Sequence, residues 1–142
     1  MYTVLLALDA DEQRAKKATE AVRSLPGSPD DLDVTILNVL EEFDVSDGQS
    51  RVRSEDFFDE SDFPDSVVLA GELLEAEGIS AAARREHGDP AETIVSIADE
   101  IDADVIAIAG RKRTPAGKVL FGSVAQAVML SADQPVLVVI DD

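Results

Sequence analysis

The sequence has no cysteine and a single histidine, His87, among its 142 residues. Without cysteine, the chain cannot form a disulfide, a thiolate nucleophile or a cysteine-based zinc site. One histidine argues against a histidine-rich metal site and against a serine–histidine catalytic pair. We therefore assign neither catalytic residues nor metal ligands, and we expect a protein that binds rather than one that catalyses.

Long apolar runs are also missing. The strand-like apolar runs reach five to six residues, whereas a membrane-spanning helix needs about 20. The chain enters its first apolar run directly after Met1 and Tyr2, without a basic leader or a small-residue cleavage site. We therefore expect a cytoplasmic protein that does not associate with membranes.

Basic residues are scarce. Twelve Lys and Arg stand against 30 Asp and Glu, which gives a formal net charge of −18. Such a chain repels the phosphate backbone of nucleic acids, which needs many cationic contacts, so we expect no nucleic-acid partner. An acidic surface with few lysines resembles that of halophilic proteins, whose self-repulsion is screened within about 3 Å at 1 M salt.

Five apolar runs of strand length alternate with segments of helical period. The runs lie at residues 3–8, 33–40, 79–86, 105–109 and 135–140. Between them, apolar residues recur at spacings of three and four near 15–25, 66–77, 90–101 and 124–130. The alternation predicts one α/β domain over residues 1–142, a doubly wound, Rossmann-like, open five-stranded parallel sheet with helices on both faces.

Residues 41–65 break this alternation. The segment is acidic and contains Phe43, Phe57 and Phe58 without a helical or strand period. We expect it to be a partly flexible surface excursion from the domain.

Two aspartates, Asp9 and Asp11, follow the first strand. We expect Asp11 to be a capping residue or a surface charge rather than a ligand of the site, and we expect Asp89 with Pro90 to cap a later helix. In an open α/β sheet, ligands bind beyond the carboxyl ends of the strands, where the strand order reverses. If the first and fourth strands are neighbours there, Asp9 and Gly110 face one crevice. The carboxylate is then available to a ribose hydroxyl and the glycine loop to phosphates.

The stretch from Gly110 to Ser123 leads from a strand into a helix. It carries four of the twelve basic residues, namely Arg111, Lys112, Arg113 and Lys118. A helix N-terminus behind a cationic loop can hold a phosphate, because its free N–H groups and its dipole favour anions. The less favoured alternative for this cluster is a salt-bridged surface loop in an acidic protein. It is not a Walker loop, since Val119 stands where that motif needs serine or threonine.

With Gly110, Gly122-Ser123, Asp89-Pro90 and the closing Pro135-Val-Leu-Val-Val, the sequence resembles the universal stress protein (UspA-like) family over essentially its whole length. Nucleotide-binding members carry glycine, two residues, glycine, nine residues and then Gly-Ser or Gly-Thr. Here Arg113 stands at the middle glycine, and the span from Gly110 to Gly122 is one residue shorter. The resemblance implies an adenine nucleotide α-hydrolase-like fold and ATP, with or without Mg²⁺, as the ligand. Any ATP hydrolysis would be slow.

The resemblance also implies a role for individual residues. Asp9 would contact the ribose or base, Val39 would offer backbone groups to adenine, and Ala7 and Leu8 would line the base pocket. The residues around the phosphates would be Gly110, Gly122, Ser123 and Val124, and Arg113 would either point away or contact the phosphates as a cationic donor. A homodimer through the last strand, Val136 to Ile140, is implied as well, because an apolar edge strand invites pairing.

Two alternatives remain open. The first is a UspA-like dimerisation or interaction module that does not bind ATP, which Arg113 and the shortened loop favour. The second, more remote, is a phospho-receiver signalling domain with the same strand number. That class needs an aspartate after the third strand and a lysine after the fifth, whereas residues 79–86 contain no aspartate and the chain ends in Asp141-Asp142.

Overall fold

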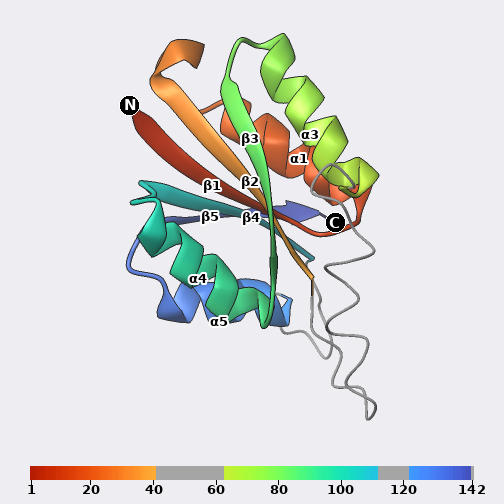
Figure 1. The fold of residues 1–142 in the computed structure, drawn as a ribbon, viewed down its shortest axis with the longest axis vertical. Coiled ribbons are helices and arrows are strands. Elements are labelled where there is room, and N and C mark those ends of the chain that lie inside the picture. Colours follow the sequence, from red (N-terminus) through yellow and green to blue (C-terminus); the bar gives the residue numbers. More distant parts are fainter. Residues whose placement is uncertain (41–62, 112–121, 142) are drawn as a thin grey trace.

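The computed structural model describes residues 1–40, 63–111 and 122–141. Its strands form one parallel sheet in the order β3-β2-β1-β4-β5. The elements in chain order are β1 (Tyr2–Leu8), α1 (Glu12–Arg23), the short 3₁₀ helix η1 (Pro29–Asp31), β2 (Leu32–Leu40), α3 (Asp65–Ala76), β3 (Ser80–His87), α4 (Pro90–Glu100), β4 (Val105–Arg111), α5 (Ser123–Ser131) and β5 (Val136–Asp141). Figure 1 shows the sheet between two helical layers.

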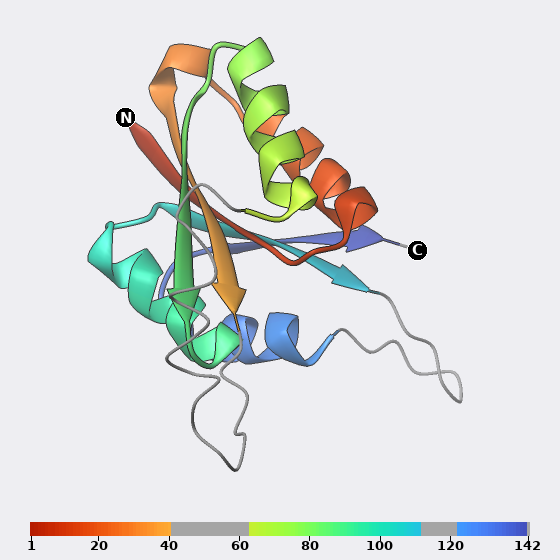
Figure 2. The same ribbon diagram turned by 45° about the vertical axis from the view of Figure 1, so that its right-hand side comes forward.

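Helices α1 and α3 lie side by side on one face of the sheet, and α4 and α5 cover the other (Figure 2). Each strand contributes side chains to the packing on both faces of the sheet, because successive side chains point to opposite sides. Leu6 packs in the cluster that includes residues of α1 and α3, whereas Leu5 packs in the cluster that includes residues of α4 and α5. Both side chains are fully buried. The doubly wound α/β fold expected from the sequence is therefore confirmed.

The strand order reverses beside β1. From β1 the chain moves outward through β2 to β3, and it then crosses to the other side of β1 to form β4 and β5. This is the switch point at which doubly wound folds bind ligands. The conditional prediction that the first and fourth strands are neighbours is confirmed, since Val4 to Ala7 pair with Val105 to Ile108.

The structure confirms Asp89 as a helix cap and shows that Asp11 is a cap rather than a surface charge. Asp11 accepts a hydrogen bond from the backbone N–H of Arg14 at 2.9 Å, and Asp89 accepts one from that of Glu92 at 3.0 Å. Each bond satisfies one of the N–H groups that a helix leaves open at its start. After α3, Gly78 adopts a φ of +77°, a left-handed conformation that glycine enters without steric cost and that ends the helix.

An ion pair on the outer edge of the sheet links β3 to α4. Arg84, on edge strand β3, pairs with Glu86 at 2.7 Å and with Glu100 of α4 at 2.5 Å. The hydrogen bond from Arg84 lowers the pKa of Glu100.

Two sequence-based expectations need a correction or a limit. Leu130, expected from its spacing to belong to the apolar pattern of the last helix, is 88% exposed, and Ala125 and Val128 form the buried side of α5 instead. Of the excursion predicted at residues 41–65, residues 41–62 lie outside the part of the chain that the structure describes. Its last residue, Asp65, is already the first residue of α3.

Candidate functional site

Two adjoining cavities open at the carboxyl ends of the central strands. The first has a volume of about 300 Å³ and the second about 250 Å³. Asp9, Ala109 and Val124 line both cavities, so the two form one continuous site. The structure thus places a crevice at the switch point, between the ends of β1 and β4.

Every predicted site residue that the structure describes lies on this crevice. The first cavity is lined by Ala7, Leu8, Asp9, Val39 and Val124, and the second by Asp9, Gly110, Gly122, Ser123 and Val124. Arg113, the remaining predicted residue, lies outside the described residues. Residues far apart in the sequence therefore meet in one place, as their positions at strand and helix ends suggested.

The first cavity is walled by apolar side chains. Leu37 of β2, Ile108 of β4 and Ile94 of α4 line it, and all three belong to the core cluster on the α4 and α5 side. Its volume is in the range of small-molecule pockets, which are mostly apolar with a few polar groups that orient the ligand. Such a cavity can take a flat, weakly polar ring, with Asp9 at its polar end.

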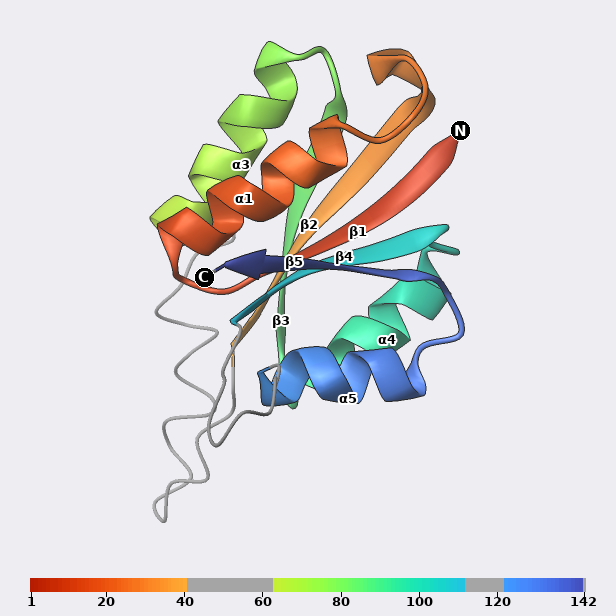
Figure 3. The same ribbon diagram turned by 180° about the vertical axis from the view of Figure 1, so that it is seen from behind.

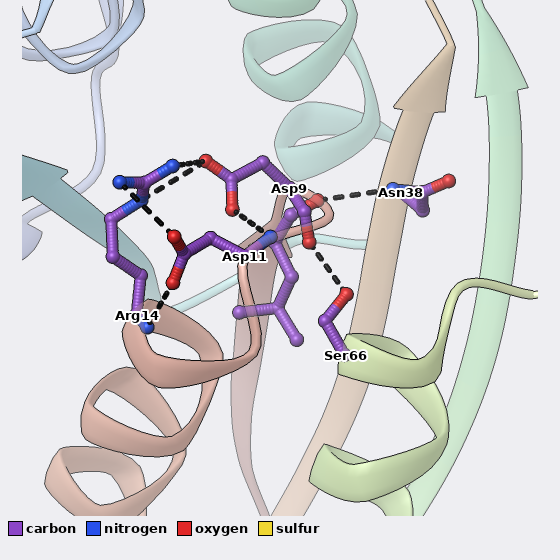
Figure 4. A network of polar contacts seen from close by, with 6 residues as sticks. Asp9, Asp11, Arg14, Asn38 and Ser66 are labelled. Atoms are coloured by element: carbon purple, nitrogen blue, oxygen red, sulfur yellow. Dashed lines mark hydrogen bonds and ion pairs between the residues drawn. The ribbon is translucent and has the colours of Figure 1, made fainter.

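Asp9 is held in a network of polar contacts, which Figure 4 shows. Its Oδ1 accepts a hydrogen bond from the backbone N–H of Asp11 at 3.0 Å. Its Oδ2 accepts hydrogen bonds from Nη2 and Nε of Arg14 at 2.9 and 3.2 Å. The Asp9 side chain is still 58% exposed. The carboxylate is thus oriented by its neighbours and remains accessible from the crevice.

The backbone at the end of β1 is fixed from the other side. Ser66, buried in the first turn of α3, donates its hydroxyl to the Asp9 carbonyl at 2.6 Å. Asn38 of β2, also buried, donates its Nδ2 to the Leu8 carbonyl at 3.2 Å. These two bonds hold the turn that carries Asp9 against α3 and β2.

The second cavity contains the N-terminus of α5. Gly122 is the N-cap residue and gives the helix no side-chain cap. The first hydrogen bond inside the helix runs from Gln126 N–H to the Gly122 carbonyl at 3.0 Å. The N–H groups of the three residues between them therefore have no acceptor within the helix. Together with the positive end of the helix dipole, they can bind an anion.

The two glycines on this cavity differ in their surroundings. A Cβ added to Gly110 would lie 3.4 Å from Val138 and 3.7 Å from Ala125, so this glycine lets the end of β4 pack closely against β5 and α5. A Cβ added to Gly122 would meet nothing within 4 Å. Only Gly110 is a glycine for reasons of packing.

Sequence reasoning missed Arg14, Asn38 and Ser66. A signal existed for Arg14, a cation three residues after the cap Asp11 and five after Asp9, which one helical turn brings back to the strand end. Nothing in the sequence points to Ser66, because its contact with Asp9 bridges 57 positions.

Within residues 1–40, 63–111 and 122–141, no group of three or more histidine, aspartate or glutamate side chains is arranged to hold a metal ion. Over the same ranges, no helix combines the length and the apolar character that crossing a membrane requires.

Comparison with known proteins agrees with this architecture. A universal stress protein of Mycolicibacterium smegmatis is 39% identical over 67 residues, which make up 46% of this chain and 52% of that protein. The match thus spans about half the length of this relative. The structure of a universal stress protein from Archaeoglobus fulgidus superposes with a TM-score of 0.71, at 26% identity and over 98% of both chains.

Two further structures share the fold and contain a nucleotide. A universal stress protein from Archaeoglobus fulgidus in complex with dAMP gives a TM-score of 0.67, at 23% identity over 98% of both chains. A universal stress family protein from Arabidopsis thaliana with AMP bound gives 0.68, at 16% identity over 100% of this chain and 93% of that one. The family model described as the universal stress protein family matches residues 1–139. The chain therefore belongs to the universal stress protein family.

Proposed function

We propose that this chain binds an adenine nucleotide, ATP in particular, and acts as a nucleotide-dependent regulatory protein of the stress response. The observation that supports this most is the meeting, at Asp9, of an apolar cavity with a cavity that contains an open helix N-terminus. An adenine nucleotide has the matching halves, a flat base and an anionic phosphate chain. The fold neighbours with dAMP and AMP add support at the level of the ligand class.

In this proposal each half of the nucleotide has its own residues. The base enters the first cavity between the apolar walls, with Val39 at its edge, and the ribose hydroxyls bond to Asp9. The phosphates lie against the N–H groups of Ser123 and Val124 and beside Gly110. Mg²⁺, where present, enters on the phosphate oxygens and keeps its own waters, as it does in many nucleotide sites.

Isothermal titration calorimetry in high salt tests the proposal. We expect heat with ATP, ADP and AMP, and much weaker binding of GTP, whose base carries different edge groups. Ser123→Ala at the start of α5 should weaken ATP binding, whereas the matched Ser131→Ala at the exposed end of the same helix should not. No heat at millimolar nucleotide would reject the proposal and favour the interaction module.

We also propose that the protein forms a homodimer through β5. This strand is at the edge of the sheet (Figure 3). The side chains from Val136 to Ile140 are half-buried in the single chain. An apolar edge strand is prone to pair with another strand. The cytoplasmic location and the halophilic character expected from the composition stay predictions.

A further inference from the structure

Arg14 lines the second cavity and is bonded to Asp9, which lines both cavities. It comes from the first turn of α1 and lines the second cavity together with Gly110, Gly122 and Ser123. Its side chain is only 18% exposed. Among the described residues that line the two cavities, it is the one basic side chain.

The segment around Arg14 is otherwise acidic, since Asp9, Asp11 and Glu12 precede it within five positions. Two of these carboxylates face the guanidinium, with Asp9 Oδ2 at 2.9 Å from Nη2 and Asp11 Oδ2 at 3.6 Å from Nη1. Without Arg14, a phosphate at this point would meet two negative charges. Arg14 cancels one of these two negative charges and places a cationic group on the second cavity itself.

The donor count allows Arg14 to do more than neutralise Asp9. A guanidinium has five N–H groups in a planar fork. Nε and Nη2 each donate one hydrogen bond to Asp9, drawn as dashed lines in Figure 4, and Asp11 faces Nη1. The second Nη2 hydrogen and the Nη1 hydrogen that does not face Asp11 can donate to another anion while the bonds to Asp9 persist.

From this geometry we propose that Arg14 bridges Asp9 to the phosphate next to the ribose, so that the site selects phosphorylated nucleosides over nucleosides. The inference rests on the proposed function, because it needs the ribose at Asp9 and the phosphates in the second cavity. It assigns the discrimination to α1, which covers the opposite face of the sheet from α5. Arginine suits the task, since its fork can bond a carboxylate and a phosphate at once.

The test compares the affinities of AMP and adenosine, by calorimetry, in the wild-type chain, in Arg14→Gln and in Arg14→Lys. For Arg14→Gln we expect the ratio of AMP to adenosine affinity to fall by about 10- to 100-fold, the usual contribution of a charged hydrogen bond. Arg14→Lys keeps the charge without the fork and should give an intermediate ratio. ³¹P NMR of bound AMP gives a second readout, in which Arg14→Gln should shift the phosphate resonance.

The control is Arg23→Gln on the same helix. Arg23 is also paired with a carboxylate, Glu77, but it does not line either cavity. The substitution changes the net charge by the same amount and should leave the AMP to adenosine ratio unchanged.

The outcomes separate the inference from the proposed function. If wild type binds AMP and Arg14→Gln weakens AMP and adenosine equally, Arg14 only orients Asp9, and the bridge is wrong while nucleotide binding stands. If the wild-type chain binds neither adenosine nor any adenine nucleotide, both proposals are wrong. A selective loss of AMP in Arg14→Gln, with Arg23→Gln unchanged, supports the bridge.

Discussion

At the scale of single residues, Gly122 is a glycine that the packing of the fold does not require. Its φ of −60° is open to any residue, and a Cβ there would meet no atom within 4 Å. Helix N-caps usually carry a serine, threonine, aspartate or asparagine whose side chain bonds to the first N–H groups. Gly122 leaves those groups exposed to the second cavity, which is what an anion site needs.

We predict that Gly122→Asp raises stability and weakens nucleotide binding. The carboxylate should cap α5 and add a few tenths of a kcal/mol to the free energy of unfolding, the usual difference between aspartate and glycine at this position. It would also occupy the N–H groups and repel the phosphates, so ATP affinity should fall at least about tenfold. Urea unfolding and calorimetry measure the two effects.

Gly122→Asn is the matched control, because asparagine caps equally well without a charge. Its stability should equal that of Gly122→Asp, and its ATP affinity should fall less. If both variants keep wild-type affinity, the phosphates do not lie at the N-terminus of α5.

At the scale of elements, the turn after β1 connects the candidate site to α3 and β2. The turn after β1 carries Asp9 and is bonded to α3 through Ser66 and to β2 through Asn38. Both of these polar side chains are buried, so the bonds form in a setting where an unmade bond is costly. The position of α3 therefore influences the position of Asp9.

We predict that Ser66→Ala weakens the attachment of the turn after β1 to α3. Removing the hydroxyl leaves the Asp9 carbonyl without that donor, which should lower the free energy of unfolding by about 1–2 kcal/mol. Nucleotide affinity should fall as well, because Asp9 loses part of its support. Thr19→Val is the control, since Thr19 makes a buried hydroxyl bond at 2.7 Å to Ala15 within α1 and does not touch Asp9. Equal nucleotide affinities in the two variants would show that the bond from Ser66 does not orient Asp9.

The elements also show what the sequence can predict. The buried runs of β1 and β4 and the cap Asp89 are local signals, encoded in consecutive residues, and the sequence predicts them. Long-range contacts are not written this way. The bond from Ser66 to Asp9 and the exposed position of Leu130 depend on how helices dock on the sheet, which no short spacing encodes. Topology predicts that Asp9 and Gly110 meet in one crevice, whereas Ala7, Leu8 and Val39 are named through the family resemblance; all five lie on that crevice, and their roles in binding stay predictions.

At the scale of the whole molecule, the two edges of the sheet differ. Edge strand β3 carries Arg84, Arg85 and Glu86, charged residues of the kind that discourage pairing. Edge strand β5 presents Val-Leu-Val-Val-Ile and no charge before Asp141. A parallel sheet with one protected and one unprotected edge can pair through only the second, so a dimer through β5 would end there and not grow into a fibre.

The backbone of β5 suggests a selective way to test this dimer. Ile106 donates its N–H to the Pro135 carbonyl at 3.0 Å, in a parallel register that sets Ile106 opposite Val136. In a parallel ladder, alternate residues bond to the neighbouring strand. The backbone groups of Leu137 and Val139 thus face β4, and those of Val138 point outward from the sheet.

We predict that Val138→Pro converts the dimer into a monomer and keeps the fold. Proline is tolerated on an edge strand where the N–H faces away from the sheet, and it removes a donor that the partner strand would need. Leu137→Pro, one position away, should instead break a bond to β4 and lower the melting temperature by several degrees. Sedimentation velocity at micromolar concentration measures the association state, and circular dichroism measures the fold. A wild-type chain that sediments as a monomer, or a Val138→Pro variant that stays a dimer, would reject pairing through β5.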